Sequence, residues 1–327
     1  MTERAYGRQT SPLRGSPRHA ALHCMLAILT VGLVSVGAGS CLPVDTRPPA
    51  GSILLTLTSD DEPSVTTADG WSIAVDRLLL GIGNASLGYD EASVSSSSNR
   101  CTHYSDAHYG RLLDGRLRTD QKIGSIFGLG QCDFYFQVAP PYFDTLLGEG
   151  VSEADKERMG GADDVEPWRR PPGIAVDFAA TATRGPEIKR VHWTFHQGIP
   201  YDNCKRTVAG VPSQLIELRS DTNFTLHIGY RSVSLFGDDA DPTIAVLRFD
   251  PIASADTLPG DGDGEITLDE LGGVPLELAR QAGRYGIGSG MSSTPQTLKD
   301  YLYVVLLPRL GQFREDIDCD RRGYGPP

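Results

Sequence analysis

An acidic, glycine-rich segment carries the side chains best suited to bind a metal ion. Its sequence is PGDGDGEITLDEL, at residues 259–271, in which carboxylates alternate with glycines ahead of a short apolar run. Oxygen ligands on a tight loop suit Ca²⁺, because this hard cation takes roughly six to eight oxygens in a flexible geometry. The segment therefore predicts either a calcium site or an acidic turn that holds no metal.

The spacing of these oxygens follows most of an EF-hand calcium loop. Such a loop supplies ligands at positions 1, 3, 5, 7, 9 and 12 and places a glycine at position 6. With Gly264 at position 6, the later ligands are, in order, Asp261, Asp263, the carbonyl of Glu265, Thr267 and Glu270. Position 1 is Pro259, which has no side-chain oxygen, so the loop lacks its first ligand.

Asp256, three residues before Pro259, is the candidate for the missing ligand. If residues 258–260 loop out as an insertion, its carboxylate reaches the first position; otherwise water fills that position. Either arrangement predicts a weak site of the extracellular kind, with a dissociation constant of roughly 10⁻⁴ to 10⁻³ M. Calcium would then have a structural role and not a signalling one.

The histidines beyond residue 40 form a second set of candidate ligands, for copper or zinc. Two lie in VHWTFHQG at residues 191–198, where the two-residue period of a strand places Trp193 on one face and His192 and His196 on the other. Four residues of strand span roughly 13 Å, too far for one ion held at about 2 Å from each ring nitrogen. One of these histidines therefore needs a partner from another strand.

His227 is the expected cross-strand partner. In FTLHIGY, at residues 224–230, apolar and polar residues alternate and His227 falls on the polar side. Facing histidines on adjacent strands would form a copper or zinc site, to which His103 or His108, in CTHYSDAHYG, could add a third ligand. The alternative is that these histidines are hydrogen-bonded or exposed and bind no metal.

Two parts of the chain resemble a known family when they are taken together. One is GWSIAVDRLLLGIGNASLG at residues 70–88, and the other is His192-Trp193-Thr194-Phe195 with the nearby Gly198. They resemble the periplasmic copper-binding proteins associated with methanobactin, the MbnP-like group. The resemblance implies a β-sandwich and copper held by histidines near an oxidisable tryptophan. Only His192 and Trp193 are carried over as motif positions.

The first forty residues have the layout of a bacterial export signal. Four arginines against one acid precede an apolar run at residues 20–36, and small residues follow. The order AGSC, ending at Cys41, resembles the lipobox of bacterial lipoproteins, which implies cleavage before Cys41 and its acylation. The alternative is a transmembrane helix, since roughly 20 apolar residues span a bilayer. Because residue 42 is Leu and not Asp, we expect lipid anchoring in the cell envelope, by default at the outer membrane.

The remaining cysteines predict two disulfides. Besides Cys24 in the leader and Cys41, the chain has Cys101, Cys132, Cys204 and Cys319. An even number of cysteines in an exported chain indicates a disulfide framework, although three pairings are open. Sequential pairing, 101 with 132 and 204 with 319, is favoured because it ties each half of the chain once. The alternative is four free, buried thiols.

The charge of the chain excludes nucleic acid as a partner. The formal net charge is −12, and the arginine-bearing leader is not part of the exported protein, which is therefore more acidic still. Nucleic-acid binding needs clustered Lys and Arg for phosphate contacts, and the sequence shows no such cluster. The expected partners are the membrane, through the lipid anchor, and metal ions. The sequence identifies no protein partner.

Short strand-like runs dominate the chain after a proline-bearing tether at residues 41–50. These runs lie at residues 52–58, 71–82, 125–138, 174–183, 188–195, 214–218, 224–235 and 244–249. About eight strands at this spacing predict one mainly β domain at residues 51–327, an antiparallel β-sandwich that contains the EF-hand-like loop at 256–271. Residues 93–99 and 159–173 are predicted surface loops.

Few helices are expected. Ser152 begins a capping-box pattern that predicts a short helix at residues 153–159, and a second helix, capped by Ser or Thr with Pro295 in its first turn, is predicted to end at residue 308. Ahead of the acidic loop, residues 244–250 read as a strand, so a paired EF-hand module is not expected. Residues 268–281 suit an exit helix interrupted by glycine and proline.

No catalytic motif is recognised. The chain has no Gly-x-Ser-x-Gly elbow, Ser-x-x-Lys pair, HExxH or P-loop, and its adjacent acidic pairs do not give the cross-cleft separation that glycoside hydrolysis needs. The leading hypothesis is a lipid-anchored, metal-binding protein of the cell envelope. The alternatives are a non-enzymatic surface or structural module stiffened by disulfides, and an enzyme whose residues lie on loops.

Overall fold

The computed structural model describes residues 48–88, 101–105, 110–161, 173–208, 211–280, 284–287 and 294–321. The chain divides into two compact units, Met1–Arg47 and Pro48–Pro327, and the described residues all belong to the second. The predicted leader with Cys41 lies outside the described residues, as do His108, the predicted loop at 93–99 and most of the predicted loop at 159–173.

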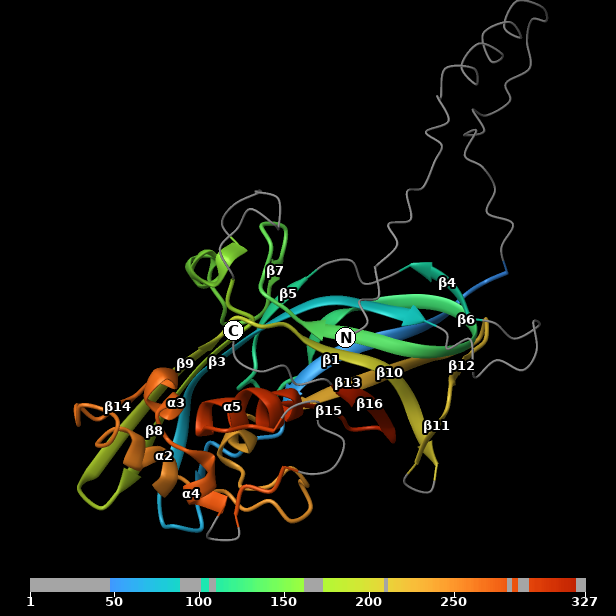
Figure 1. Cartoon of the computed structure of the whole chain (residues 1–327). Coiled ribbons are helices and arrows are strands. Elements are labelled where there is room, and N and C mark those ends of the chain that lie inside the picture. Colours follow the sequence, from blue (N-terminus) through green and yellow to red (C-terminus); the bar gives the residue numbers. More distant parts are fainter. Residues whose placement is uncertain are drawn as a thin grey trace, which may run out of the picture. The chain divides into compact units, whose positions relative to one another are not determined.

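The described residues form one large sheet of sixteen strands that curls around its core (Figure 1). Its main path runs in the order β14 (Glu265–Ile266), β9 (Glu187–Phe195), β8 (Val176–Arg184), β3 (Ser72–Gly88), β6 (Gln121–Val138), β1 (Gly51–Ser59), β13 (Asn223–Tyr230) and β15 (Gly311–Phe313). The other strands pair beside this path: β2 (Ser64–Thr66), β4 (Thr102–Ser105), β5 (Arg111–Asp114), β7 (Leu146–Leu147), β10 (Ile199–Val208), β11 (Val211–Gln214), β12 (Ile216–Leu218) and β16 (Ile317–Arg321).

The predicted mainly β class is confirmed, and most strand pairs are antiparallel. Three pairs are parallel: β1 with β13, β5 with β7 and β14 with β9. The first is extensive, since it runs in register from Ser52 opposite Asn223 to Ser59 opposite Tyr230. A parallel pair needs a long crossover between its strands, and here most of the sheet is built from the residues between β1 and β13. The place of β13 in the sheet therefore depends on pairing between parts of the chain that are far apart in sequence.

The strand period of two places one face of the sheet in the core. In β9 the side chains of Val191, Trp193 and Phe195 are buried whereas His192 is exposed, as the alternation predicts. On the core side, the ring of Phe195 packs against Tyr303, with ring centroids 5.2 Å apart. Tyr303 belongs to the C-terminal helical segment, which therefore covers the inner face of the sheet at this edge.

The helices are short, as expected. They are α1 (Glu153–Lys156), α2 (Asp250–Ala255), α3 (Leu268–Gly272), α4 (Leu276–Arg280) and α5 (Leu298–Tyr301), which continues in tighter and wider turns to Arg309. Figure 1 shows α2, α3, α4 and α5 gathered at one end of the sheet. The predicted capping box at Ser152 is present, with Asp155 as its second member. The C-terminal helix begins later than predicted, because Thr297 and Asp300 form its capping box.

Two predicted strands are wrong in part. Residues 244–249 are irregular apart from a single bridge between Leu247 and Gly237, and they follow a turn at which Asp241 accepts hydrogen bonds from the backbone N–H and the hydroxyl of Thr243. The predicted strand at 224–235 ends at Tyr230. There the buried carboxylate of Asp61 accepts the N–H of Ser232 at 2.6 Å, and a 3₁₀ turn follows.

The two disulfides join the predicted partners. Cys101 is bonded to Cys132, which ties the start of β4 to β6, and Cys204 is bonded to Cys319, which ties β10 to β16. The sequence separations are 31 and 115 residues. The prediction of sequential pairing is therefore confirmed.

Replacing both cysteines of a pair by alanine should destabilise the protein more for the longer loop. Loop-closure entropy gives a cost of about 4–5 kcal/mol for Cys204 with Cys319 and about 3–4 kcal/mol for Cys101 with Cys132. Urea unfolding of the two double variants measures this difference. A larger loss for the 101 and 132 pair would show that the entropy of the unfolded chain does not govern the effect.

Candidate metal centre

The acidic loop lies between two short helices. The helix α2 ends at Ala255, Asp256 follows as its C-cap, and α3 begins after Thr267. The strand predicted to lead into the loop is therefore wrong. Pro251 occupies the first turn of α2, and Asp69 accepts the N–H groups of Phe249 and Asp250, each at 2.8 Å, which holds the start of the helix.

Asp256 is brought to the other carboxylates because the residues after it loop out. Leu258 is 83% exposed, and the N–H of Gly260 returns to the carbonyl of Ala255 at 2.7 Å. As a result, Asp256, Asp261 and Asp263 each offer an oxygen within 4.8 Å of the others. This is the arrangement expected if an insertion separates the first ligand from the rest of the loop.

The backbone of the loop takes the tight turn that the glycines allow. Gly262 and Gly264 have φ angles of 79° and 89°, in the left-handed region that residues with a Cβ rarely adopt. Asp261 accepts the N–H of Asp263 at 3.2 Å, and Asp263 accepts the N–H of Glu265 at 2.7 Å. Asp256 closes the turn by accepting the N–H of Gly264 at 2.9 Å. The carboxylates therefore converge because they organise the turn themselves.

Glu270 and Thr267 form the capping box of α3. Glu270 accepts the N–H and the hydroxyl of Thr267 through Oε2, at 2.6 and 3.0 Å, and Thr267 accepts the N–H of Glu270 at 3.2 Å. Both side chains line the same open depression as Asp261, Asp263 and Glu265. Glu270 uses one oxygen to cap the helix, so only Oε1 is left to face a metal ion.

The loop is bonded to the edge of the sheet. Its strand β14 pairs with β9, with Glu265 opposite Arg190 and Ile266 opposite Val191. Trp193 donates its indole N–H to the carbonyl of Ile266 at 2.9 Å, and Ile266 is fully buried. Trp193 is fully buried as well and packs among aromatic rings, so its role here is to hold the loop.

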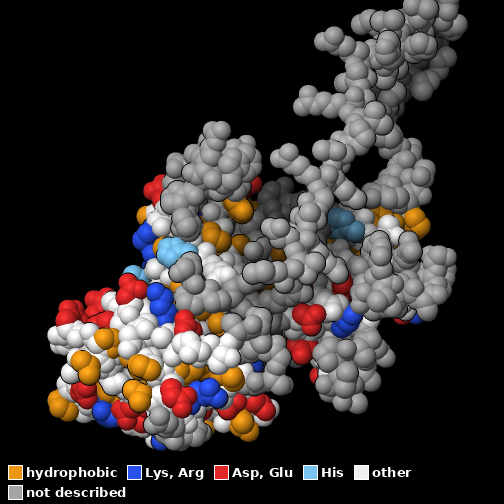
Figure 2. Space-filling model, viewed as in Figure 1, with side chains coloured by type: hydrophobic (Ala, Val, Ile, Leu, Met, Phe, Trp, Pro, Cys, Tyr) orange, Lys and Arg blue, Asp and Glu red, His pale blue; other side chains and the backbone are white. Residues whose placement is uncertain are grey.

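Lys189 on β9 places an ammonium group against Asp256, whose side chain is fully buried. Burial acts to raise the pKa of Asp256, but the hydrogen bonds from Lys189 and from the N–H of Gly264 lower the pKa below its usual value. Asp256 is thus an anion in the folded protein. Figure 2 shows further acidic side chains on the surface around β14.

The predicted histidine pair does not form. His192 lies on β9, which pairs with β8 and β14, whereas His227 lies on β13, which pairs with β1 and β15. The cross-strand prediction is therefore wrong, because β13 pairs in parallel with β1, and four strands (β8, β3, β6 and β1) separate it from β9 along the sheet. His227 contacts Glu315 through Nδ1 at 2.6 Å and lies 3.7 Å from Asp120 through Nε2.

The other histidines add no ligand group within the described residues. His196 contacts the carbonyl of Gly173 through Nδ1 at 3.1 Å, and His103 is exposed on β4. In the part of the chain that the structure describes, the group of three close His, Cys, Asp or Glu side chains is that of Asp256, Asp261 and Asp263, and it contains no histidine. Copper or zinc binding stays a prediction, with His108 outside the described residues.

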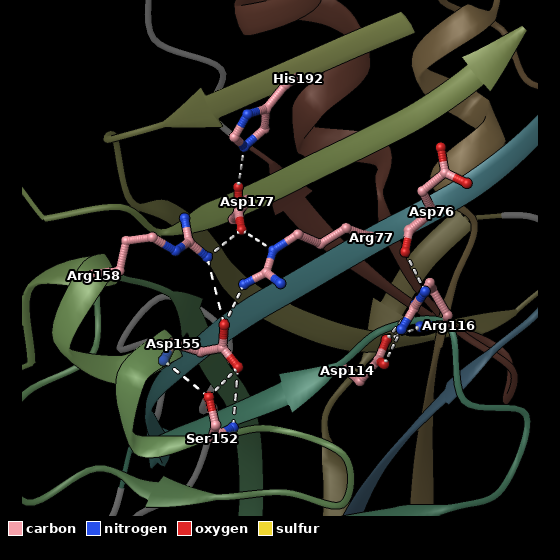
Figure 3. Close-up of polar contacts among 9 residues, drawn as sticks. All are labelled: Asp76, Arg77, Asp114, Arg116, Ser152, Asp155, Arg158, Asp177 and His192. Atoms are coloured by element: carbon pink, nitrogen blue, oxygen red, sulfur yellow. Dashed lines mark hydrogen bonds and ion pairs between the residues drawn. The ribbon is translucent and has the colours of Figure 1, made fainter.

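His192 belongs instead to an ion network around a second buried carboxylate (Figure 3). Asp177 is fully buried, and its Oδ1 lies 2.9 Å from Nε2 of His192. Its Oδ2 accepts from Nε of Arg77 and from a terminal nitrogen of Arg158, the latter at 2.5 Å. Arg77 also donates to Asp155 at 2.5 Å. The network fastens α1 and the turn after it to the outer face of the sheet.

The sequence by itself does not predict this network. Its one signal is the charged Asp177 within the apolar run of β8, between the buried residues Val176 and Phe178. The partners Arg77, Arg158 and His192 come from three separate elements, so no spacing in the sequence links them. Arg158 is followed by Met159, which is buried against Leu79 and Leu112 in a small second core. Charge pairing and apolar burial therefore act together on this segment.

Comparison with protein-family models, with curated proteins and with solved structures finds no match for this chain. The resemblance to the MbnP-like group thus stays a prediction from the sequence. Among the described residues, none of the helices is both long and apolar enough to cross a bilayer. What the protein does must therefore be inferred from the geometry of its sites.

The network at Asp177 should make stability depend on acid pH. Burial acts to raise the pKa of Asp155, but Arg77 and Ser152 lower it to about 2, and the pKa of Asp177 is also lowered. A carboxyl group with a depressed pKa stabilises the folded state above its unfolded pKa of about 4, and this contribution is lost as the pH falls towards 2. We expect Arg77→Met to cost about 2–4 kcal/mol near pH 6.

Urea unfolding at several pH values from 6 to 3 tests this expectation. The difference between wild type and Arg77→Met should shrink as the pH falls, because in the variant the carboxylates lack Arg77 and take up protons at a higher pH than in wild type, which relieves part of the loss. Arg219→Met, which breaks an exposed pair with Glu217, is the matched control and should change little at any pH. A cost for Arg77→Met that is the same at pH 6 and pH 3 would contradict the role of ion pairing.

Proposed function

We propose that this protein is a lipid-anchored, calcium-binding protein of the cell envelope. The observation that carries the proposal is the convergence of Asp256, Asp261 and Asp263, each with an oxygen within 4.8 Å of the others, on a loop bonded to the sheet. Ca²⁺ at this point would join α2, the acidic loop and the edge of the sheet. Its role is structural.

The chemistry of the loop favours Ca²⁺ over copper or zinc. The candidate ligands are all oxygens, from carboxylates, the hydroxyl of Thr267 and the carbonyl of Glu265, and oxygen ligands suit hard cations. Mg²⁺ fits less well, because it demands a near-ideal octahedral geometry and gives up its water reluctantly. The depression is open to solvent, so water can complete the coordination of a Ca²⁺ ion. The weak affinity expected of such a site suits millimolar calcium outside the cytoplasm.

The proposed location follows from the leader and agrees with the disulfides. The lipobox-like AGSC at residues 38–41 supports acylation of Cys41 and anchoring in the envelope, by default at the outer membrane. Two disulfides within the domain are typical of an oxidising compartment. The residues between Cys41 and β1 then tether the domain to the membrane. In this arrangement calcium and the disulfides both stiffen a domain that is held at a membrane surface.

Calcium should bind at about one ion per chain and stabilise the fold. With a dissociation constant of roughly 10⁻⁴ M, Ca²⁺ at about 1 mM adds on the order of 1.4 kcal/mol, which corresponds to a rise in Tm of roughly 2–4 °C for a domain of this size. Asp263→Asn should remove most of this rise, because it takes a charge from the loop. Elemental analysis by mass spectrometry and thermal unfolding with and without Ca²⁺ measure the two quantities.

Glu217→Gln is the matched control for this experiment. It removes one exposed negative charge on β12, outside the loop, and should leave the calcium-induced rise in Tm unchanged. Equal loss of the rise in both variants would mean that calcium acts through net charge and not through the loop. Bound copper or zinc in place of calcium would refute the proposal in favour of a histidine site.

Acylation of Cys41 has a separate test. When the chain is expressed in a Gram-negative host fed radiolabelled palmitate, we expect the label in wild type and none in Cys41→Ser. Cys24→Ser, which changes a cysteine within the leader, should keep the label. Label that persists in Cys41→Ser would place the lipid elsewhere and refute the proposed anchor.

A further inference from the structure

The ammonium group of Lys189 contacts Asp256 in the interior of the candidate site. Asp256 is fully buried, and the side chain of Lys189 is only 14% exposed. Lys189 lies on β9, one residue before the pairing of Arg190 with Glu265, so the sheet holds it in register with the loop. The contact therefore joins a cation of the sheet to the carboxylate that begins the loop.

The two oxygens of Asp256 have different partners. Oδ1 accepts the N–H of Gly264 at 2.9 Å and so maintains the turn of the loop. Oδ2 is the oxygen left to meet a cation, and it accepts from Nζ of Lys189. A metal ion bound by Asp256 in the first ligand position would need this same oxygen. The ammonium group and a metal ion therefore compete for one atom.

The competition has a physical reason on both sides. If both Lys189 and a metal ion were absent, Asp256 would be a buried carboxylate with no charged partner, which is costly. In the metal-free protein, Lys189 removes that cost. With a metal ion bound, the two cations would repel each other at close range. The flexible stem of lysine lets its ammonium group move towards water while the methylene groups stay packed.

We propose that Lys189 is an internal competitor of Ca²⁺, which neutralises Asp256 in the metal-free protein and is displaced when the ion binds. This inference rests on the proposed function, because it concerns the affinity of the same site. Lys189 then lowers the affinity for Ca²⁺ and keeps the loop docked on β9 when the metal is absent. Lys189 is then the cation that neutralises Asp256 in the metal-free protein, and a Ca²⁺ ion from solution neutralises it in the loaded protein.

Lys299 provides a matched control from the same region. It pairs with Asp269 at 2.9 Å, but Asp269 is 95% exposed and lies outside the candidate ligand set. Both lysines are therefore paired with an aspartate of the segment 256–271, and only Lys189 contacts a candidate ligand. An effect of general charge would be shared by the two residues, whereas direct competition is specific to Lys189.

The first experiment measures Ca²⁺ affinity by isothermal titration calorimetry on the full chain in detergent, as wild type, Lys189→Met and Lys299→Met. We expect Lys189→Met to bind Ca²⁺ at least tenfold more tightly than wild type and Lys299→Met to change by less than threefold. Equal or weaker binding by Lys189→Met, with wild type still binding, overturns the inference and leaves the proposed function standing. No binding by wild type or by Lys189→Met overturns the proposed function and the inference with it.

The second experiment uses wild type alone, in case Lys189→Met does not fold. Brief acetylation with acetic anhydride, followed by peptide mass spectrometry, reports how accessible each lysine is with calcium chelated and at saturating Ca²⁺. We expect acetylation of Lys189 to rise at least threefold with Ca²⁺, because its ammonium group leaves the interior, and acetylation of Lys299 to stay constant. Unchanged or reduced acetylation of Lys189 in calcium-loaded protein overturns the inference.

Discussion

The indole N–H of Trp193 donates to the carbonyl of Ile266, and this buried hydrogen bond joins the acidic loop to the edge of the sheet. The short strand β14 and Lys189 add to the same attachment from β9. A loop that carries several carboxylates would otherwise be pushed apart by its own charge. The position of the candidate metal centre therefore depends on β9, which supplies both Trp193 and Lys189, two side chains that the two-residue period of a strand places on the same face.

The two buried aspartates that contact side chains of β9 differ in how their charge is satisfied. Asp177 has two guanidinium groups and His192 around it, so both of its oxygens have side-chain partners. Asp256 has one backbone N–H and one ammonium group, on a loop that lacks other cations of its own. The first arrangement is complete and fastens a segment to the sheet. The second has a single charged side-chain partner, which the Ca²⁺ ion proposed above would displace.

Local patterns predicted the elements that depend on near neighbours. The alternation in β9 placed Trp193 in the core and His192 outside it, and the glycine and aspartate spacing placed a tight turn at Gly264. Predictions that needed distant contacts fared less well. The run at 244–249 has strand composition but finds only a single bridge. His227 has the alternation of a strand residue, yet the neighbours of β13 are decided by its parallel pairing with β1, which no local pattern encodes.

The sequence by itself determined the mainly β class, the ligand types of the acidic loop, and the number of cysteines available for two disulfides, whereas the structure chose one of the three possible pairings. These features depend on side-chain chemistry and on short spacings, which can be recognised in the sequence without knowledge of the fold. The tertiary structure alone decided that Asp256 meets Asp261 and Asp263 with Lys189 beside it, that His192 joins Asp177, and that His192 and His227 lie apart. The reason is that strand order in a curled sheet is set by burial and pairing over long separations. Side chains far apart in sequence become neighbours only when that order is complete.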